Sequence, residues 1–136
     1  MESLRQRLSG VNIFSGLPDE VLDGFVTNGS TVKYPPGSEI VRQGAQEAGL
    51  HLLLSGSAEV IVGDRVVATL GPGEYFGEIA VIDGGPRSAT VRSAGDEATK
   101  TFRISPAGFW SVVGDNPKAL RQLLESLAGM LRNQES

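Results

Sequence analysis

The sequence contains no cysteine and a single histidine, His51. Without cysteine the chain cannot form a disulfide framework, a zinc ribbon, a thiol nucleophile or a thiol redox centre. One histidine excludes a multi-histidine metal site, and a Ser-His-Asp triad would have to use His51. Long apolar runs are also missing. None approaches the roughly 20 residues that span a bilayer, and the N-terminus lacks the apolar core of a secretory signal.

Positive charge is scarce as well, because 12 lysines and arginines stand against 16 aspartates and glutamates, which gives a formal net charge of −4. A chain of this charge does not, as a whole, attract nucleic acid or an anionic membrane. We therefore expect a small, soluble, cytoplasmic domain that contacts no nucleic acid and does not insert into a membrane. The length of 136 residues fits one domain with a single core.

Glycine, by contrast, is abundant, and eleven of the eighteen glycines lie between Gly37 and Gly95. Together with several prolines, these glycines separate short apolar runs that have the β-branched content of strands. Gly63-Asp64, between two such runs, predicts a tight hairpin. Many short strands that are separated by turn residues in this way are typical of a β-sandwich or barrel. The predicted strands are Thr31–Tyr34, Glu39–Arg42, Leu50–Leu54, Ala58–Val62, Val66–Leu70, Ala89–Arg92 and Thr101–Ile104.

The two ends of the chain have helical patterns instead. Apolar residues recur at helical spacing between Leu4 and Val11. A second helix opens at Leu17–Glu20, where proline suits the first turn and the acidic residues favour the positive end of the helix dipole. Ser105-Pro106 begins a third helix and Asn116-Pro117 a fourth. The apolar face of the fourth helix comprises Leu120, Leu123, Leu124, Leu127, Met130 and Leu131.

The segment from Gly71 to Arg92 carries the residues best suited to binding chemistry. Gly77 allows the backbone to pass close to another group, and Glu78–Ile82 is long enough for one helical turn. The Asp83-Gly84-Gly85-Pro86 turn ends that helix and returns the chain to a strand. A helix start between glycine turns presents backbone N–H groups that suit an anion.

Two charged side chains complete this segment. Arg87 follows the rigid Pro86, near a strand that begins at about Ser88, and supplies a planar fork of donors for a phosphate. Glu78, in the first helical turn, can accept hydrogen bonds from hydroxyl groups such as those of a ribose. A phosphate together with a sugar indicates that the ligand is a nucleotide.

These residues resemble the phosphate-binding cassette of cyclic nucleotide-binding domains, through Phe76-Gly77-Glu78-Ile79-Ala80 followed by Pro86-Arg87-Ser88-Ala89-Thr90-Val91. That family includes the catabolite activator proteins, the regulatory subunit of protein kinase A and cyclic nucleotide-gated channels. Tyr34–Gly44 and Leu54–Val60 are similar to the first strand pair and the central hairpin of the family. The resemblance extends from about Phe14 to the last helix.

The resemblance implies a mainly β fold: an eight-stranded, jelly-roll-like β-roll flanked by N-terminal helices and C-terminal lid helices. We therefore expect residues 1–136 to form one cyclic nucleotide-binding domain. Its parts would be a helical segment at 1–29, the β-roll with the cassette at 30–104, and C-terminal helices at 105–133.

The resemblance also implies roles for the residues at matching positions. Arg87 would bind the equatorial oxygen of a cyclic phosphate and Glu78 the ribose 2′-hydroxyl, with backbone N–H groups completing the cradle. Ser88 lies where the family often has threonine when it prefers cGMP, so serine favours cAMP, with cGMP as the second possibility. No cofactor is expected besides this ligand. The predicted binding residues are Phe76, Gly77, Glu78, Ile79, Ala80, Arg87, Ser88 and Ala89.

The function that follows is a regulatory sensor, not an enzyme, in which binding moves the lid helix Pro117–Arg132 toward the base. Four leucines are candidates for contact with the base, and the same helix could support a homodimer. The effector domain or partner protein is left open. The four leucines are Leu120, Leu123, Leu124 and Leu127.

Other interpretations stay open beside this one. The domain could be a degenerate, structural member of the family that binds no nucleotide, although such members typically lack the cassette arginine or acid. A cupin-like enzyme on a similar β-roll would usually need several histidines. His51 is interpreted as a half-buried strand residue rather than a ligand.

Overall fold

The computed structural model describes residues 3–46, 49–78 and 80–135. The chain divides into two compact units. A β-roll unit comprises Gly29–Pro106, and a helical unit combines Met1–Asn28 with Ala107–Ser136. The expectation that the chain forms one domain with the boundaries given above stays a prediction.

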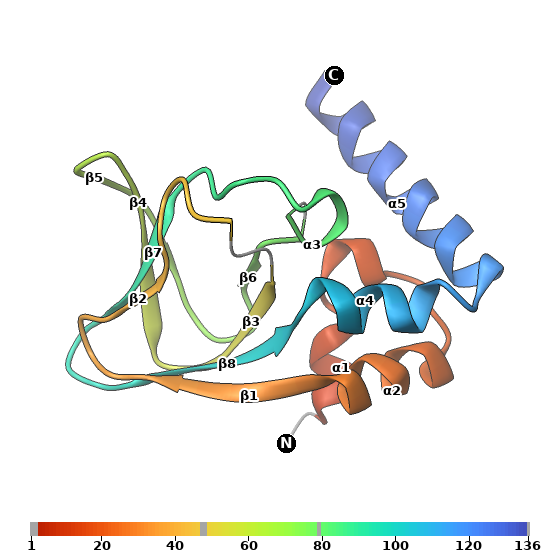
Figure 1. The fold of residues 1–136 in the computed structure, drawn as a ribbon, viewed down its shortest axis with the longest axis horizontal. Helices are drawn as coiled ribbons and strands as arrows, with labels where there is room; N and C mark the ends of the chain where they lie inside the picture. Colours follow the sequence, from red (N-terminus) through yellow and green to blue (C-terminus); the bar gives the residue numbers. More distant parts are fainter. Residues whose placement is uncertain (1–2, 47–48, 79, 136) are drawn as a thin grey trace. The chain divides into compact units, whose positions relative to one another are not determined.

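The β-roll unit contains, in the part of the chain that is described, eight strands in two four-stranded sheets whose pairings are all antiparallel (Figure 1). This confirms the expected eight-stranded roll with helices before and after it in the chain. One sheet has the order β1 (Gly29–Tyr34), β8 (Thr99–Ile104), β3 (Leu50–Ser55) and β6 (Tyr75–Phe76). The other has the order β2 (Glu39–Val41), β7 (Thr90–Ala94), β4 (Ser57–Val62) and β5 (Arg65–Leu70).

The predicted strands correspond to seven of these elements. The hairpin at Gly63-Asp64 is confirmed, because Val62 pairs with Arg65 across a two-residue loop. The eighth strand, β6, is only two residues long and pairs with β3. A segment this short has no alternation of apolar and polar residues that a sequence pattern could detect.

The interior of the β-roll is apolar and draws on both sheets. Strands β2, β3, β4 and β7 contribute the buried side chains. Partly buried side chains from β1, β4, β5 and β6 pack against them. The buried set is Ile40, Val41, Leu53, Ala58 and Val91, and the packed set is Tyr34, Val60, Leu70 and Phe76.

The helical unit contains α1 (Leu4–Leu8), the 3₁₀ turn η1 (Asn12–Phe14), α2 (Asp19–Asn28), α4 (Pro106–Val113) from its second residue onward, and α5 (Pro117–Glu135). Helices α2, α4 and α5 begin at or next to Pro18, Pro106 and Pro117, as expected. Phe25 is central to their packing: its ring centroid lies 4.5 Å from that of Phe14 and 5.7 Å from that of Phe109. Three buried aromatic rings therefore join segments that are far apart in the chain.

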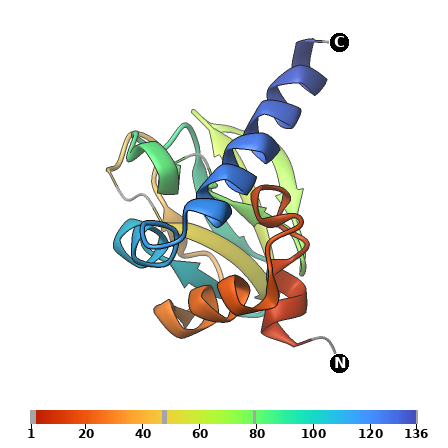
Figure 2. The same cartoon turned by 90° about the vertical axis from the view of Figure 1, so that its right-hand side faces the viewer.

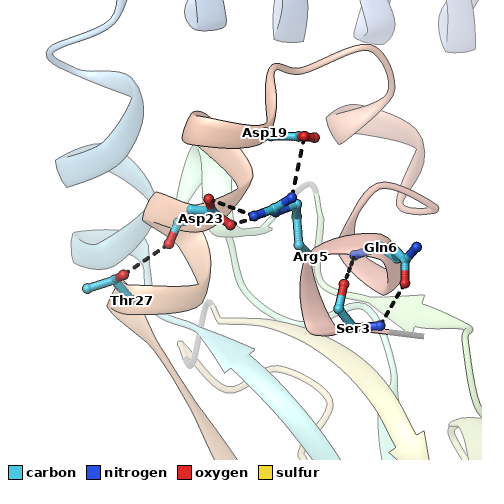
Figure 3. A network of polar contacts seen from close by, with 6 residues as sticks. All are labelled: Ser3, Arg5, Gln6, Asp19, Asp23 and Thr27. Atoms are coloured by element: carbon cyan, nitrogen blue, oxygen red, sulfur yellow. Dashed lines mark hydrogen bonds and ion pairs between the residues drawn. The ribbon is translucent and has the colours of Figure 1, made fainter. Parts of the chain in front are cut away.

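Arg5 connects α1 to α2 at the surface of the helical unit (Figure 3). Its Nε donates to Oδ1 of Asp23 over 2.7 Å and its Nη2 donates to Oδ2 over 3.1 Å, while Nη1 reaches Asp19 at 3.4 Å. The hydrogen bond and the charge of Asp23, and then the charge of Asp19, raise the pKa of Arg5. Because the site is exposed, this network orients the two helices more than it stabilises them.

Helix α5 keeps part of its apolar face in solvent. Leu123 is buried, whereas Leu124 is 59 % exposed and Leu131 is 60 % exposed. The C-terminal turns of α5 extend away from the other helices of its unit (Figure 2). The homodimer through this helix stays a prediction. Among the residues that the structure describes, no helix combines the length and the apolar character needed to cross a bilayer.

Candidate functional site

A pocket of about 500 Å³ opens in the β-roll unit. Its volume lies in the range of small-molecule sites. One wall is apolar and comes from strands of the second sheet. The other side is formed by β6, the short helix α3 (Ala80–Asp83) and the loop that follows it. The lining residues of the wall are Val41, Val60, Leu70 and Val91, and those of the other side include Tyr75, Phe76, Gly77, Glu78, Ala80, Asp83, Gly85, Pro86, Arg87, Ser88 and Ala89.

Arg87 is the one cationic residue among the described residues that line the pocket, and it is only 7 % exposed. Its Nη2 donates to the backbone carbonyl of Gly49. Its Cζ lies 5.9 Å from the ring centroid of Phe76, within the range of a cation–π contact. The guanidinium carries a positive charge and a planar fork of donors, so it attracts an anion that enters the pocket.

The backbone of Arg87 is held by a loop, not by a strand. Its N–H donates to the carbonyl of Ala45 over 2.9 Å, and its carbonyl accepts from the N–H of Gly44 over 2.8 Å. These two bonds take the place of a sheet ladder, so β7 begins at Thr90. The predicted strand start at about Ser88 is therefore wrong by two residues. Arg87 lies in the loop before β7, where hydrogen bonds hold both its backbone N–H and its backbone carbonyl.

Gly77 makes the close approach of the arginine possible. Its φ angle is +89°, in the region that favours glycine, and a Cβ atom placed there would lie 2.6 Å from Nη1 of Arg87 and would also meet the carbonyl of Gly49. The carbonyl of Gly77 accepts from the N–H of Val81 over 3.0 Å. This bond spans Glu78, but α3 itself begins at Ala80, so the expectation that Glu78 lies in the first helical turn is wrong: Glu78 lies in the turn before the helix.

Two carboxylates share the pocket with Arg87. Glu78 is partly buried, and Asp83 is exposed at the end of α3, where its Oδ1 accepts from the N–H of Gly85 over 2.8 Å. Among the described residues, the charged lining therefore comprises two acids and one base. A ligand that is both anionic and rich in hydroxyl groups matches this set, because its phosphate can bind the base and its hydroxyls can donate to an acid.

The structure brings seven of the eight predicted site residues to the lining of one pocket. Ser88 is exposed there, whereas Ala80 and Ala89 are partly buried. Ile79 lies outside the described residues. Sequence reasoning missed the apolar wall and Asp83. The wall residues were visible only as strand positions, since their convergence depends on how the strands pair across the sheet.

Metal ligands do not gather anywhere in residues 3–46, 49–78 or 80–135: no three histidine, aspartate or glutamate side chains there are placed to hold a metal ion.

Comparison with known proteins assigns the segment that contains the pocket to a protein family. Residues 31–116 match the family model described as "Cyclic nucleotide-binding domain". This range contains every residue that lines the pocket and every predicted site residue.

Individual relatives agree with that match. The chain is 36 % identical over 103 residues to a cAMP-dependent protein kinase regulatory subunit of Mycosarcoma maydis, covering 73 % of this chain and 18 % of the relative. It is 40 % identical over 88 residues to a cGMP-dependent protein kinase of Toxoplasma gondii, covering 64 % of this chain and 9 % of the relative. The chain thus spans less than a fifth of the length of these two relatives.

A solved structure shows the same fold. The catabolite activator protein of Thermus thermophilus superposes with a TM-score of 0.73 at 30 % sequence identity, covering 91 % of this chain and 60 % of that protein.

Proposed function

The chain belongs to the family of cyclic nucleotide-binding domains, which are regulatory and typically non-catalytic, and from this premise we propose that its pocket binds a cyclic nucleotide, with cAMP preferred over cGMP. One observation carries the proposal: the buried Arg87 lines the same pocket of about 500 Å³ as Glu78. In this arrangement Arg87 binds the cyclic phosphate and Glu78 accepts from the ribose 2′-hydroxyl. The domain acts as a sensor and catalyses no reaction on the nucleotide.

Preference between the two nucleotides rests on Ser88. Its side chain is exposed at the pocket, so it can meet a ligand. The relatives named for the two nucleotides point in both directions, since one is a cAMP-dependent and the other a cGMP-dependent protein kinase component. The resemblance of Ser88 to the cAMP-type position therefore decides the preference that we propose.

The second part of the proposal is that helix α5 transmits the binding of the nucleotide. An empty site leaves the cassette loop and α5 loosely held, and a bound cyclic phosphate draws the loop together around Arg87. Helix α5 then moves and passes the signal on. A ligand shifts such an equilibrium only by its differential affinity for the two states.

Heteronuclear NMR during titration with cAMP and with cGMP tests both parts. We expect shifts in residues 71–92 with both nucleotides, at lower concentrations of cAMP, and further shifts in 117–133. 5′-AMP is the matched control, because it carries the same base and ribose without the cyclic ester, and it should bind more weakly. No shifts with either cyclic nucleotide would favour the degenerate, structural interpretation. Shifts confined to 71–92 would contradict transmission alone.

Glu78→Gln should weaken cAMP binding mildly, by about fivefold. Glutamine retains an acceptor oxygen but loses the charge, and the difference between a charged and a neutral hydrogen bond is about 1 kcal/mol. Isothermal titration calorimetry with cAMP and 2′-deoxy-cAMP measures the effect on both the variant and the original chain.

The effects of Glu78→Gln and of removing the 2′-hydroxyl should not add, because both act on the same contact. The original chain should bind 2′-deoxy-cAMP more weakly than cAMP, and Glu78→Gln should bind the deoxy analogue no worse than the original chain does. Equal affinity of the original chain for cAMP and its deoxy analogue would exclude the ribose role of Glu78.

A further inference from the structure

Three side chains form a contact series from the interior of the β-roll to the pocket. His51 on β3 is 1 % exposed and stacks on Phe76 with ring centroids 4.8 Å apart and planes 7° from parallel. Phe76 in turn contacts the guanidinium of Arg87. His51 does not itself line the pocket. We call the series His51, Phe76 and Arg87, in which two stacked rings lead to the guanidinium, the ring column.

The register of the sheet produces the first contact of the ring column. His51 and Phe76 are direct partners in the β3–β6 pairing, so their side chains emerge on the same face of the sheet. The expectation of a half-buried His51 is therefore wrong: β6 and its ring cover the imidazole. The two-residue strand β6 ends at Phe76, and both of its residues line the pocket.

The imidazole is fixed from its other sides. Its Nδ1 lies 3.1 Å from Oγ1 of Thr101 on β8, and the ring of Tyr34 on β1 is tilted against it at a centroid distance of 6.3 Å. A ring that is fixed by a hydrogen bond and by a second aromatic neighbour holds a flat platform for Phe76. An aliphatic side chain would fill the same volume but would not select one orientation of the Phe76 ring.

We propose that His51 is a positioning residue for the anion site, acting through Phe76 on the guanidinium of Arg87. Arginine has many rotamers, and ordering it only when the ligand arrives would weaken binding. The ring of Phe76 and the carbonyl of Gly49 together keep the guanidinium in place before the ligand arrives. The effect on nucleotide affinity rests on the proposed function, whereas the effect on Arg87 itself does not.

The test compares His51→Leu, which keeps most of the volume but removes the ring, with His51→Phe, which keeps a ring that can stack. The first readout needs no ligand. It is the Nε–Hε cross-peak of Arg87 in a ¹H–¹⁵N spectrum, assigned by its loss in Arg87→Lys. We expect this cross-peak to move toward the position of a freely rotating arginine in His51→Leu and to stay near its original position in His51→Phe.

The second readout is the dissociation constant for cAMP. His51→Leu should bind about three- to tenfold more weakly, the loss expected for a weakened cation–π contact. His51→Phe should restore the affinity to within about twofold. Ser93→Ala is the matched control, because Ser93 is also 1 % exposed and hydrogen-bonded, to Thr99, but lies outside the ring column and the pocket lining. It should change neither readout.

An unchanged Arg87 cross-peak in His51→Leu would overturn the proposal, and so would equal losses of affinity in His51→Leu and His51→Phe. If His51→Leu does not fold, Phe76→Leu removes the same link, and an unmoved cross-peak in that variant would also overturn it. Failure of the original chain to bind any cyclic nucleotide would refute the proposed function, while the ligand-free cross-peak would still decide whether the ring column positions Arg87.

Discussion

Arg87→Ala should reduce the affinity for cAMP by two to four orders of magnitude. A hydrogen bond to a charged group contributes about 1.5–3 kcal/mol, and a phosphate bound by the arginine fork would lose two of them, about 3–6 kcal/mol in all. The burial of the guanidinium supports the upper part of this range, because charges interact more strongly when they are shielded from solvent. Isothermal titration calorimetry with cAMP measures the loss.

Arg92→Ala is the control for this experiment. It changes the net charge of the chain by the same amount, and Arg92 also lies in the β-roll unit, where its Nη2 donates to Glu59 over 2.9 Å. Arg92 does not line the pocket. Arg92→Ala should therefore bind cAMP as the original chain does, and a loss confined to Arg87→Ala would reflect the site and not the overall charge.

Arg87→Lys separates charge from geometry. Lysine keeps the positive charge but has no planar fork and cannot lie flat against Phe76 in the same way. It should recover only part of the affinity that Arg87→Ala loses. If Arg87→Ala bound cAMP as tightly as the original chain, Arg87 would not be the phosphate ligand, and the proposed function would lose the observation that carries it.

Sequence patterns predicted the fold where the signal was local. The strands separated by glycine turns and the helices opened by Pro18, Pro106 and Pro117 all formed near the expected positions. Proline and glycine restrict or extend the backbone of their immediate neighbours, so their effects can be anticipated without knowing the tertiary structure. Strand β6 was not predicted because two residues are too few to show the alternation of apolar and polar side chains that marks a strand.

The parts of the site that sequence could not predict depend on contacts between distant segments. Arg87 was expected near a strand start, yet its backbone bonds to Gly44 and Ala45, more than forty residues earlier in the chain. The stacking of His51 on Phe76 requires the register of a strand pair that no pattern indicated. Motif spacing could therefore identify which residues face a ligand, but not what holds those residues in place.

The same distinction applies to the glycines. Gly73 and Gly77 are both in the left-handed region, with φ angles of +90° and +89°. A Cβ atom at Gly73 would meet nothing within 4 Å, whereas one at Gly77 would meet Arg87 and the Gly49 carbonyl. From the sequence both are turn residues, and Gly77 is also expected to let the backbone pass close to another group that the sequence does not identify. Only the structure shows that one of them also leaves room for the arginine.

Gly77→Ala should therefore be far more disruptive than Gly73→Ala, although the two substitutions impose the same backbone strain. A left-handed conformation costs an alanine about 1–2 kcal/mol, and this should be the whole effect of Gly73→Ala on the free energy of unfolding. Forcing a methyl group into an occupied space adds about 1–3 kcal/mol, so Gly77→Ala should lose about 2–5 kcal/mol. Urea denaturation of both variants gives the comparison.

The affinity for cAMP should also be lower in Gly77→Ala than in Gly73→Ala. In Gly77→Ala, the guanidinium of Arg87 and the Gly49 carbonyl cannot both keep their places, because the new methyl group meets each of them. The affinity for cAMP should fall by at least about tenfold, since a charge-assisted contact is displaced, while Gly73→Ala should bind normally. Equal stability and equal affinity in the two variants would mean that the close approach at Gly77 does not position Arg87. A deficit found only in Gly77→Ala would show that its lack of a side chain is required by the anion site itself.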